Sequence, residues 1–387
     1  MEWRKIVFSM GNTTAINFLQ DIRVIDFSQF LPGPYATQLL SDLGAEVIKV
    51  ERSGGDAMRK VGPIGNDGIS LFYKTLNSGK QIIELDLQSE SGKNYFTELL
   101  NCADVLLESF RPGVLDKLGF SVERLRRDYP RLVICSLSGY GQTGPYRLRP
   151  GHDLNYLAHS GLLHHTGSVD SPTQPQPPIS DYAGAMQAVN CILAALFGRT
   201  VSNQGAYLDI SLAETVLSWQ GMALNNSGRQ AYSTERGNGV DSGGAAGYRI
   251  YRTADKRFIT LGIEGEPFWS KFCNTVDKPE WIGRLVEPIP QTALIDEVQA
   301  LFLSQTNAFW CELLDEADCC FEAVLDIDDI MQHPQVRARQ LLTTSNGTDP
   351  FVQVNYPAWI NGAPPTNRPP PHDTSIDSIL KTWEFDT

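Results

Sequence analysis

The sequence lacks the motifs that mark several common kinds of ligand site. No GxGxxG follows the first strand-like segment, where a dinucleotide fingerprint would stand, and no GxxxxGKS of a P-loop occurs. The seven cysteines are scattered, and the one close pair, Cys319 and Cys320, is adjacent rather than spaced as CxxC. The six histidines show no spacing typical of zinc ligands. We therefore expect free thiols in a reducing compartment, no disulfide framework and no metal site.

Positive charge is also scarce. The chain has 32 Lys and Arg against 45 Asp and Glu, a net charge of −13 at pH 7. Nucleic acids and anionic membranes are themselves negative, so we expect neither as a partner, although a few local cations can still hold a phosphorylated small molecule. No apolar run approaches the roughly 18 residues that span a bilayer. The N-terminal segment, with an acid at position 2, is a poor signal peptide, so we expect a cytoplasmic protein.

Strand-like and helix-like segments alternate along the first half of the 387 residues. Buried-strand patterns rich in β-branched residues predict strands, and helical spacing lies between several of them. This alternation predicts an α/β fold with an open parallel sheet of Rossmann type. The predicted strands are 22–27, 46–51, 81–87, 104–108, 132–137 and 205–212, and the predicted helices are 35–43, 91–100, 121–128, 185–199 and 214–220.

A change of pattern after residue 225 indicates a second, smaller domain. The stretch 225–247 is rich in Gly, Ser, Asn and charge, as in a linker or mobile loop. A predicted hairpin, 248–253 with 258–263, and helical stretches at 267–275, 293–304 and 308–315 follow it. We expect an N-terminal extension (1–18), a large Rossmann-like domain (19–225), a small α+β domain (226–330) and a C-terminal return to the large domain (331–387). In that return, 329–342 reads as helix, 350–354 as strand and the Pro-rich 363–371 as extended chain.

Several cations stand near the ends of the predicted strands. Arg52 follows one strand, Lys80 precedes another, and Arg111 and Lys117 follow a third. Ligands of open parallel sheets bind beyond the carboxyl ends of the strands. These cations therefore indicate a phosphate-bearing ligand, with solvated surface charge as the alternative for each one.

Two acid/base clusters occur about thirty residues apart. Gly151, His152 and Asp153 form the first, and Ser180 and Asp181 belong to the second. The apolar run and Pro-rich loop between them allow the second cluster to fold back onto the first. We expect His152 and Asp181 to face each other across one small site. Asp181 also precedes a long apolar helix, where an Asp commonly serves as the N-cap, and an isolated His is more often structural.

Several stretches together resemble family III CoA-transferases and their relatives, the α-methylacyl-CoA racemases. They are RVIDFSQFLPGPYATQLLSDLGAEVIKVERSGGD, NSGKQIIELDLQSESGK, ADVLLESFRPGVLDKLGF, LSGYGQTGPY and MQHPQVRAR. The resemblance covers nearly the whole chain from about residue 19. GHDLNYLA, with its His before the Asp, and the later SDYAGA look like the racemase branch, although the turn after Asp181 has fewer glycines than the racemase form.

The resemblance implies a fold, a substrate class and a set of site residues. It implies an interlocked homodimer in which each chain threads through the other, acyl-CoA thioesters as substrates, and no tightly bound cofactor. It implies His152 and Asp181 as the acid/base pair in a racemase, or Asp153 as the carboxylate nucleophile in a transferase, and a supporting glutamate at Glu264 or Glu266. The expected CoA- and substrate-binding residues are Arg52, Leu76, Asn77, Lys80, Ser109, Phe110, Arg111, Lys117, Gly151, Leu154, Asn155, Tyr156, Ser180, Tyr182, Ala183, Gly184 and Glu264.

Three functions remain open on the sequence alone. The first is a racemase or epimerase of 2-methylacyl-CoA thioesters, which moves a proton at C2 through an enolate. The second is a CoA-transferase that forms an anhydride on Asp153. The third is a protein that binds CoA thioesters without turnover.

Overall fold

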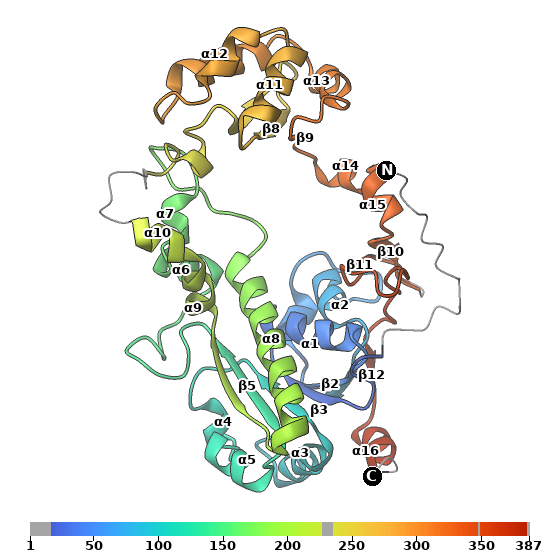
Figure 1. The fold of residues 1–387 in the computed structure, drawn as a ribbon. Coiled ribbons are helices and arrows are strands. Elements are labelled where there is room, and N and C mark those ends of the chain that lie inside the picture. Colours follow the sequence, from blue (N-terminus) through green and yellow to red (C-terminus); the bar gives the residue numbers. More distant parts are fainter. Residues whose placement is uncertain (1–16, 227–234, 347–348, 385–387) are drawn as a thin grey trace. The chain divides into compact units, whose positions relative to one another are not determined.

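The computed structural model describes residues 17–226, 235–346 and 349–384 (Figure 1). Within them the chain forms two compact units: unit 1 holds 17–156, 178–216 and 331–384, and unit 2 holds 157–177 and 217–330. Unit 2 therefore begins at 217 rather than at the expected 226. It also takes in 157–177, because Arg236 Nε donates a 2.6 Å hydrogen bond to the Ser168 carbonyl. The expected extension, 1–18, lies almost wholly outside the described residues.

Seven parallel strands form the sheet of unit 1 and confirm the Rossmann-like prediction. Their order is β12-β3-β2-β1-β4-β5-β6, which reverses direction between β1 and β4. Such a reversal opens a crevice at the carboxyl ends of the two strands, where ligands of this fold bind. The strands are β1 (Arg23–Phe27), β2 (Glu46–Glu51), β3 (Gln81–Glu84), β4 (Val105–Glu108), β5 (Val133–Ser138), β6 (Tyr207–Ser211) and β12 (His372–Asp373).

Helices cover both faces of this sheet. One apolar core joins α1 and α8 to the first face, and a second joins α3, α5 and α16 to the other. Each sheet face is thus buried, which explains why the strands are nearly continuous apolar runs. The helices of unit 1 are α1 (Pro32–Asp42), α2 (Leu71–Asn77), α3 (Glu90–Cys102), α4 (Val114–Lys117), α5 (Val122–Asp128), α8 (Ile179–Ser202), α15 (Pro334–Ala338) and α16 (Ile376–Glu384).

Helix α8 is the one described helix that is long and apolar enough to cross a membrane, judged by length and composition alone. The sequence prediction that no segment approaches this length missed it, since polar residues interrupt the apolar run. Its Ala185, Ala188 and Ile192 are fully buried in the core shared with α1 and the sheet. Phe197 and Val201 instead face solvent, at 77% and 86% exposure.

Unit 2 is the expected small α+β unit. An antiparallel sheet of three strands, in order β7-β8-β9, packs against helices through a core of aromatic and aliphatic side chains. The predicted hairpin 248–253 with 258–263 is confirmed as β7 and β8. The elements are β7 (Tyr248–Arg252), β8 (Phe258–Gly262), β9 (Phe321–Ala323), α7 (Leu162–His165), α10 (Gly221–Asn226), α11 (Glu266–Thr275), α12 (Thr292–Phe302), α13 (Asn307–Leu314) and the 3₁₀ turns η3 (Val240–Ser242) and η4 (Pro279–Arg284).

Three short helices cross the boundaries between the two units. They are α6 (Asp153–His159), α9 (Leu212–Leu217) and α14 (Ile327–Gln332).

The C-terminal return differs from the prediction in one place. The stretch 329–342 does not form one helix, because Pro334 lacks an N–H donor and separates α14 from α15. Leu342–Thr344 then forms β10, which pairs antiparallel with β11 (Val352–Val354), so the predicted strand at 350–354 is confirmed.

Candidate active site

The loops after β1 and β4 meet where the strand order reverses. The Gln29 amide donates to Ser109 Oγ at 3.1 Å, and the rings of Phe27 and Phe110 pack edge to face with centroids 4.6 Å apart. Ser109, Phe110 and Arg111 therefore follow the carboxyl end of β4, the end of the sheet at which ligands of this fold bind. Their role in substrate binding stays a prediction.

Lys80 has a different role from the one that the sequence indicated. Its side chain is fully buried, and its Nζ donates to Asp26 Oδ2 at 2.9 Å, Asn77 Oδ1 at 3.0 Å and the Pro34 carbonyl at 2.7 Å. These contacts use all three donors of an ammonium group and leave none for a phosphate. Burial alone would raise the pKa of Asp26, but the charges of Lys80 and Lys49 outweigh it and hold that pKa well below its usual range.

The neighbours of Lys80 in the expected binding set are likewise buried. Leu76 and Asn77 lie in α2 at 5% and 1% exposure, and Asn77 Nδ2 donates to the Tyr73 carbonyl. The Asn77 side chain also accepts a hydrogen bond from Lys80 Nζ, so these two residues hold the segment before β3, while Leu76 is buried beside them in α2. We correct the expectation of direct CoA contact for these three side chains on that ground.

The remaining expected cations are accessible. Arg52, Arg111 and Lys117 are all exposed. Arg111 also lines a cavity of 270 Å³ at the carboxyl ends of β4 and β5, together with Arg126 and Gln142. Two guanidinium groups at one cavity offer bidentate donors of the kind that recognise phosphate.

Glu108 is a buried acid in this cavity that the sequence reading did not single out. It is the last residue of β4, is 4% exposed, and accepts a 2.8 Å hydrogen bond from the Phe110 amide. Burial raises its pKa to about 7, against the opposing effect of hydrogen bonds from Ser136 and Phe110. The only sequence signal was an acid closing the buried strand DVLLE.

The two acid/base clusters come together as predicted. Asp153 Oδ1 accepts two hydrogen bonds from Ser180, one from the amide at 2.7 Å and one from Oγ at 2.6 Å. Ser180 lies in the first turn of α8, so Asp153 binds an amide that no helical carbonyl satisfies, at the positive end of the helix dipole. The bond fastens the start of α6 to the start of α8.

Asp181 lies beside this contact. It belongs to the first turn of α8, but Pro178 holds the N-cap position, so Asp181 is not the cap. Burial, and then the negative charge of Asp153, raise the pKa of Asp181 to about 7. A carboxyl group with this pKa is able both to give and to take a proton near neutral pH.

Tyrosines and glycines fix the position of the clusters. Tyr156 is buried and donates a 2.6 Å hydrogen bond to the Gly151 carbonyl, and burial followed by the charge of Asp181 raises its pKa to about 12. Gly151 must lack a side chain, because a Cβ there would lie 2.8 Å from the Tyr156 ring. Tyr182 packs edge to face on Tyr35, with centroids 4.7 Å apart.

Other expected residues of the second cluster have packing roles. Ala183 and Gly184 are buried in α8, and a Cβ on Gly184 would lie 2.2 Å from Leu212 Cδ2. Gly184 therefore permits the close approach of α8 and Leu212.

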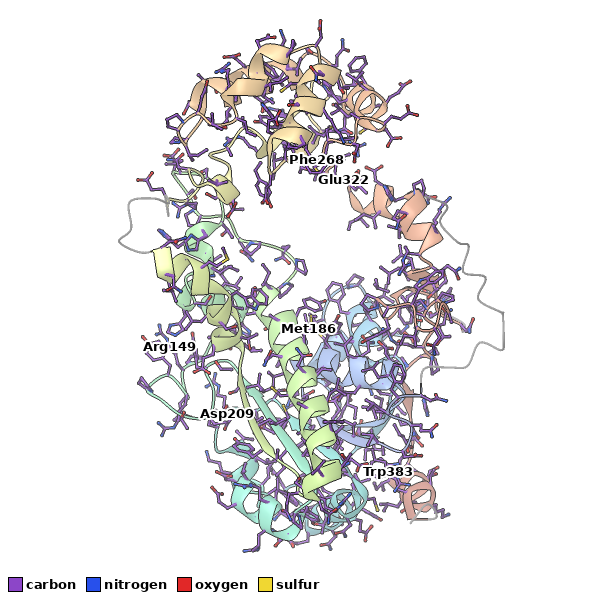
Figure 2. The ribbon with its side chains drawn as sticks, viewed as in Figure 1. Arg149, Met186, Asp209, Phe268, Glu322 and Trp383 are labelled. Carbon is purple, nitrogen blue, oxygen red and sulfur yellow. The ribbon has the colours of Figure 1, made fainter. Side chains whose placement is uncertain are left out.

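The loop before Gly151 is held by Asp209 of β6, which is labelled in Figure 2. Its Oδ1 accepts a hydrogen bond from the Gln142 amide at 3.0 Å.

The His152 side chain is exposed. Its backbone amide donates to Asn155 Oδ1 at 3.0 Å, which closes the first turn of α6, and Leu154 and Asn155 are exposed beside it. No described residue hydrogen-bonds the His152 ring.

The two glutamates expected to support His152 lie in unit 2. Glu264 is exposed, whereas Glu266 begins α11 and accepts a 2.7 Å hydrogen bond from Ser270. Support of His152 by Glu264 or Glu266 stays a prediction.

Within the described ranges, no group of three or more His, Cys, Asp or Glu is placed to hold a metal ion. The cysteines in those ranges are all free thiols, as predicted.

Comparison with known proteins identifies the family. The sequence profile of CoA-transferase family III matches residues 19–374. The chain belongs to CoA-transferase family III. It is therefore related to enzymes that act on acyl-CoA thioesters, and both racemases and CoA-transferases are among the relatives.

Two family III relatives mark this range of activities. The α-methylacyl-CoA racemase of Homo sapiens is 31% identical over 342 residues, which cover 86% of this chain and 84% of that protein. The acetyl-CoA:oxalate CoA-transferase of Acetobacter aceti is 33% identical over 349 residues, 88% of each chain. Among solved structures, a CAIB/BAIF family protein from Brucella suis superposes with a TM-score of 0.81 at 25% identity, covering 94% of this chain and 98% of that one.

Proposed function

We propose that this family III enzyme racemises 2-methylacyl-CoA thioesters by proton transfer at C2, with His152 and Asp181 as the two acid/base groups. The observation that carries the proposal is the Asp181 carboxyl group, whose pKa burial and Asp153 raise to about 7. A proton shuttle needs a group that is populated in both protonation states at the working pH. The His-Asp pair in GHDLNYLA supports the same assignment.

The reaction needs two groups on opposite faces of C2. One face loses its proton to a group in its unprotonated form, which leaves an enolate, and the other face receives a proton from a group in its protonated form. With Asp181 protonated and His152 neutral, His152 takes the proton and Asp181 gives one, and the reverse reaction exchanges their roles. Amides in the first turn of α8 suit the enolate oxygen. The Ser180 amide is already occupied by Asp153, so other amides of that turn would serve.

A CoA-transferase is the second candidate, and one observation favours it. Asp153 is held through Oδ1 alone, because both Ser180 hydrogen bonds go to that oxygen. The fixed carboxylate therefore has Oδ2 as its available nucleophilic atom. Attack on the thioester carbonyl would form the acyl–aspartyl anhydride and release CoA as the thiolate. The thiolate would then attack the Asp153 carbonyl of this anhydride, which forms an aspartyl–CoA thioester and releases the donor carboxylate. The acceptor carboxylate would attack this thioester to form a second anhydride, and the released thiolate would attack the acceptor carbonyl, which gives the new acyl-CoA and the free Asp153 carboxylate.

CoA enters in either case as part of the substrate, and we propose that Arg52 and Arg111 bind its phosphate-bearing part. Both side chains are exposed, and Arg111 lines the cavity at the ends of β4 and β5. The double variant Arg52→Ala/Arg111→Ala should weaken CoA binding in calorimetry. An unchanged affinity would withdraw the assignment.

The proposed working form is the interlocked homodimer. Large apolar side chains are exposed on helices of both units, among them Phe197 and Val201 on α8 and Met222 on α10. Exposed apolar groups in this number are typical of a surface that another chain covers.

Proton NMR of 2-methylacyl-CoA in deuterium oxide, with no second acid present, tests the function. Loss of the C2 proton signal, with collapse of the methyl doublet, is the result expected of a racemase. His152→Ala and Asp181→Ala should each abolish this exchange. Absence of exchange, with CoA transfer once oxalate or succinate is added, would assign the transferase reaction and Asp153.

A further inference from the structure

Glu108 is a buried acid that the proposed reaction does not use. It lines the 270 Å³ cavity of unit 1 beside Ser136 of the neighbouring strand, and the two residues are 4% and 2% exposed. Among the residues that the structure describes, no lysine or arginine forms an ion pair with the Glu108 carboxyl group. A buried carboxylate is costly unless a cation accompanies it, so ionisation of Glu108 favours the approach of one.

Arg111 is a cation placed to make this approach. It lines the same cavity, three residues after Glu108, and its side chain is exposed. Within the described ranges its guanidinium group has no hydrogen bond or ion pair that would fix its direction. The cavity has room for this group, since one water occupies only about 10–15 Å³ on the same scale of volume. Arg111 is therefore able to turn either toward solvent or toward Glu108.

The backbone between the two residues is held in place. The Phe110 amide donates a 2.8 Å hydrogen bond to Glu108 Oε2, and the Gln29 amide donates a 3.1 Å hydrogen bond to Ser109 Oγ. A change in the direction of Arg111 therefore needs rotation of its side chain and no movement of the loop. Side-chain rotation of an exposed arginine is cheap, because several rotamers are open to it.

The other ionisable groups around Glu108 come from two helices and two strands. They are Asp116 of α4, Glu123 and Arg126 of α5, Cys135 of β5, and Tyr207 and Asp209 of β6.

Glu108 changes its charge near neutral pH in these surroundings. Burial is the largest cause that raises the pKa of Glu108 to about 7, and the negative charges of Asp116 and Asp209 add to it. Burial also raises the pKa of Cys135 and of Tyr207, so both stay uncharged at pH 7. Arg111 thus faces a neutral acid below pH 7 and a carboxylate above it.

We propose that Glu108 is a positioning residue for Arg111: its protonated form leaves the guanidinium group free to bind CoA phosphate, and its ionised form draws that group into the cavity. CoA affinity then falls as pH rises through neutrality. This inference rests on the proposed function, in which Arg111 binds the phosphate-bearing part of CoA.

The first test measures the Kd for CoA by calorimetry at pH 6 and pH 8. Glu108→Gln keeps the acceptor for the Phe110 amide but stays uncharged, so it reports the titration of CoA itself and of all other groups. From pH 6 to pH 8 the Kd of the wild type should rise about tenfold relative to that of Glu108→Gln. The reason is that the fraction of chains with protonated Glu108 falls from about nine-tenths to about one-tenth.

Glu123→Gln is the matched control for this measurement. It removes an exposed acid that lines the same cavity, and it should follow the wild type. Equal pH dependence in the wild type and Glu108→Gln, or the same effect in Glu123→Gln, would overturn the proposal.

The second test removes the cation. If Glu108 acts through Arg111, then Arg111→Ala and Arg111→Ala/Glu108→Gln should show the same change of Kd with pH. A difference between them that persists would overturn the proposal, as would its loss in Arg126→Ala instead. Should Glu108→Gln fail to fold, the ratio of Kd at pH 8 to Kd at pH 6 should still be larger in the wild type than in Arg111→Ala.

The third test needs no ligand. The infrared difference between the wild type and Glu108→Gln contains the carbonyl band of the protonated Glu108 carboxyl group, and its loss with pH gives a titration midpoint. The same difference recorded in the Arg111→Ala background should have its midpoint at higher pH, because the carboxylate has lost its cation. An unchanged or lower midpoint would overturn the pairing.

The outcomes separate this inference from the proposed function. Unchanged CoA affinity of Arg111→Ala at pH 6 would refute the proposed role of Arg111 in CoA binding. Weakened affinity of Arg111→Ala, without any pH effect that depends on Glu108, would leave that role standing and refute the control by Glu108.

Discussion

The substitution Asp153→Asn separates the two candidate reactions. An amide oxygen can still accept both hydrogen bonds from Ser180, which are 2.7 and 2.6 Å long, so the contact between α6 and α8 should persist. The negative charge is lost. A racemase should keep exchanging the C2 proton, whereas a transferase that uses Asp153 as its nucleophile should lose all transfer.

The same variant makes a quantitative prediction about pH. The pKa of Asp181 rises from 3.8 to about 7, with burial as the larger cause and the charge of Asp153 as the smaller. Removing that charge should lower the apparent pKa that Asp181 contributes to the pH profile of the exchange rate. The decrease should be less than half of the rise from 3.8 to about 7, because burial is the larger cause. Each pH unit corresponds to about 1.36 kcal/mol of interaction between the two carboxylates.

The assay is C2 proton exchange followed by NMR from pH 5 to 9 for the wild type, Asp153→Asn and Asp181→Asn. Asp181→Asn should lower the rate by roughly 100- to 10,000-fold, as expected for loss of a general acid/base. An apparent pKa of Asp181 that is unchanged or higher in Asp153→Asn would refute the electrostatic coupling between the two carboxylates. Complete loss of exchange in that variant, with its fold intact, would refute the assignment of Asp153 as a supporting charge.

Three further predictions concern other parts of unit 1. Lys80→Met removes the ion-pair partner of the buried Asp26 carboxylate and should cost about 3–5 kcal/mol in urea unfolding, whereas Arg124→Met, in an exposed pair, should change stability by less than about 1 kcal/mol. If the proposed homodimer forms, Phe197→Glu should shift it toward monomer in light scattering, because the Phe197 side chain is 77% exposed on α8; a monomeric wild type would contradict this. Glu108 has a pKa raised by burial to about 7, so its folded form holds a proton that the unfolded chain releases above about 4.5. Its contribution to stability is therefore present below pH 4.5 and lost as pH rises through 7, and Glu108→Gln should flatten this fall in unfolding free energy.

The main sheet could be predicted because its strands are continuous apolar runs with polar ends. Both faces of the sheet are buried, as the side chains of Val24, Ile25, Val47 and Ile48 show. Their segments are therefore predicted as strands without any tertiary information. β12 could not be predicted in this way. His372–Asp373 has no apolar pattern, and it becomes a strand only by pairing with β3.

Only part of the candidate site could be predicted from the sequence. The approach of Ser180 to Asp153 was predictable, since two polar clusters flank one loop. The role of Lys80 was not, because its partner Asp26 lies 54 residues away and the sequence does not reveal which lysines are buried. Glu108 was missed for a related reason: an acid at the end of a strand acquires a raised pKa only when the fold removes it from water.

The discontinuity of unit 1 has a consequence for synthesis on the ribosome. Residues 217–330 contain most of unit 2 and leave the ribosome before α16. Trp383 of α16 is fully buried in the core that includes α3, and its carbonyl accepts a 3.0 Å hydrogen bond from Arg23. β3 also has one unpaired edge until β12 has been made. Unit 2 can therefore fold while unit 1 is still incomplete, with an unpaired strand edge and an uncovered apolar face. Slow synthesis of residues 331–384 would prolong the interval in which this nascent chain is open to aggregation or to capture by a chaperone.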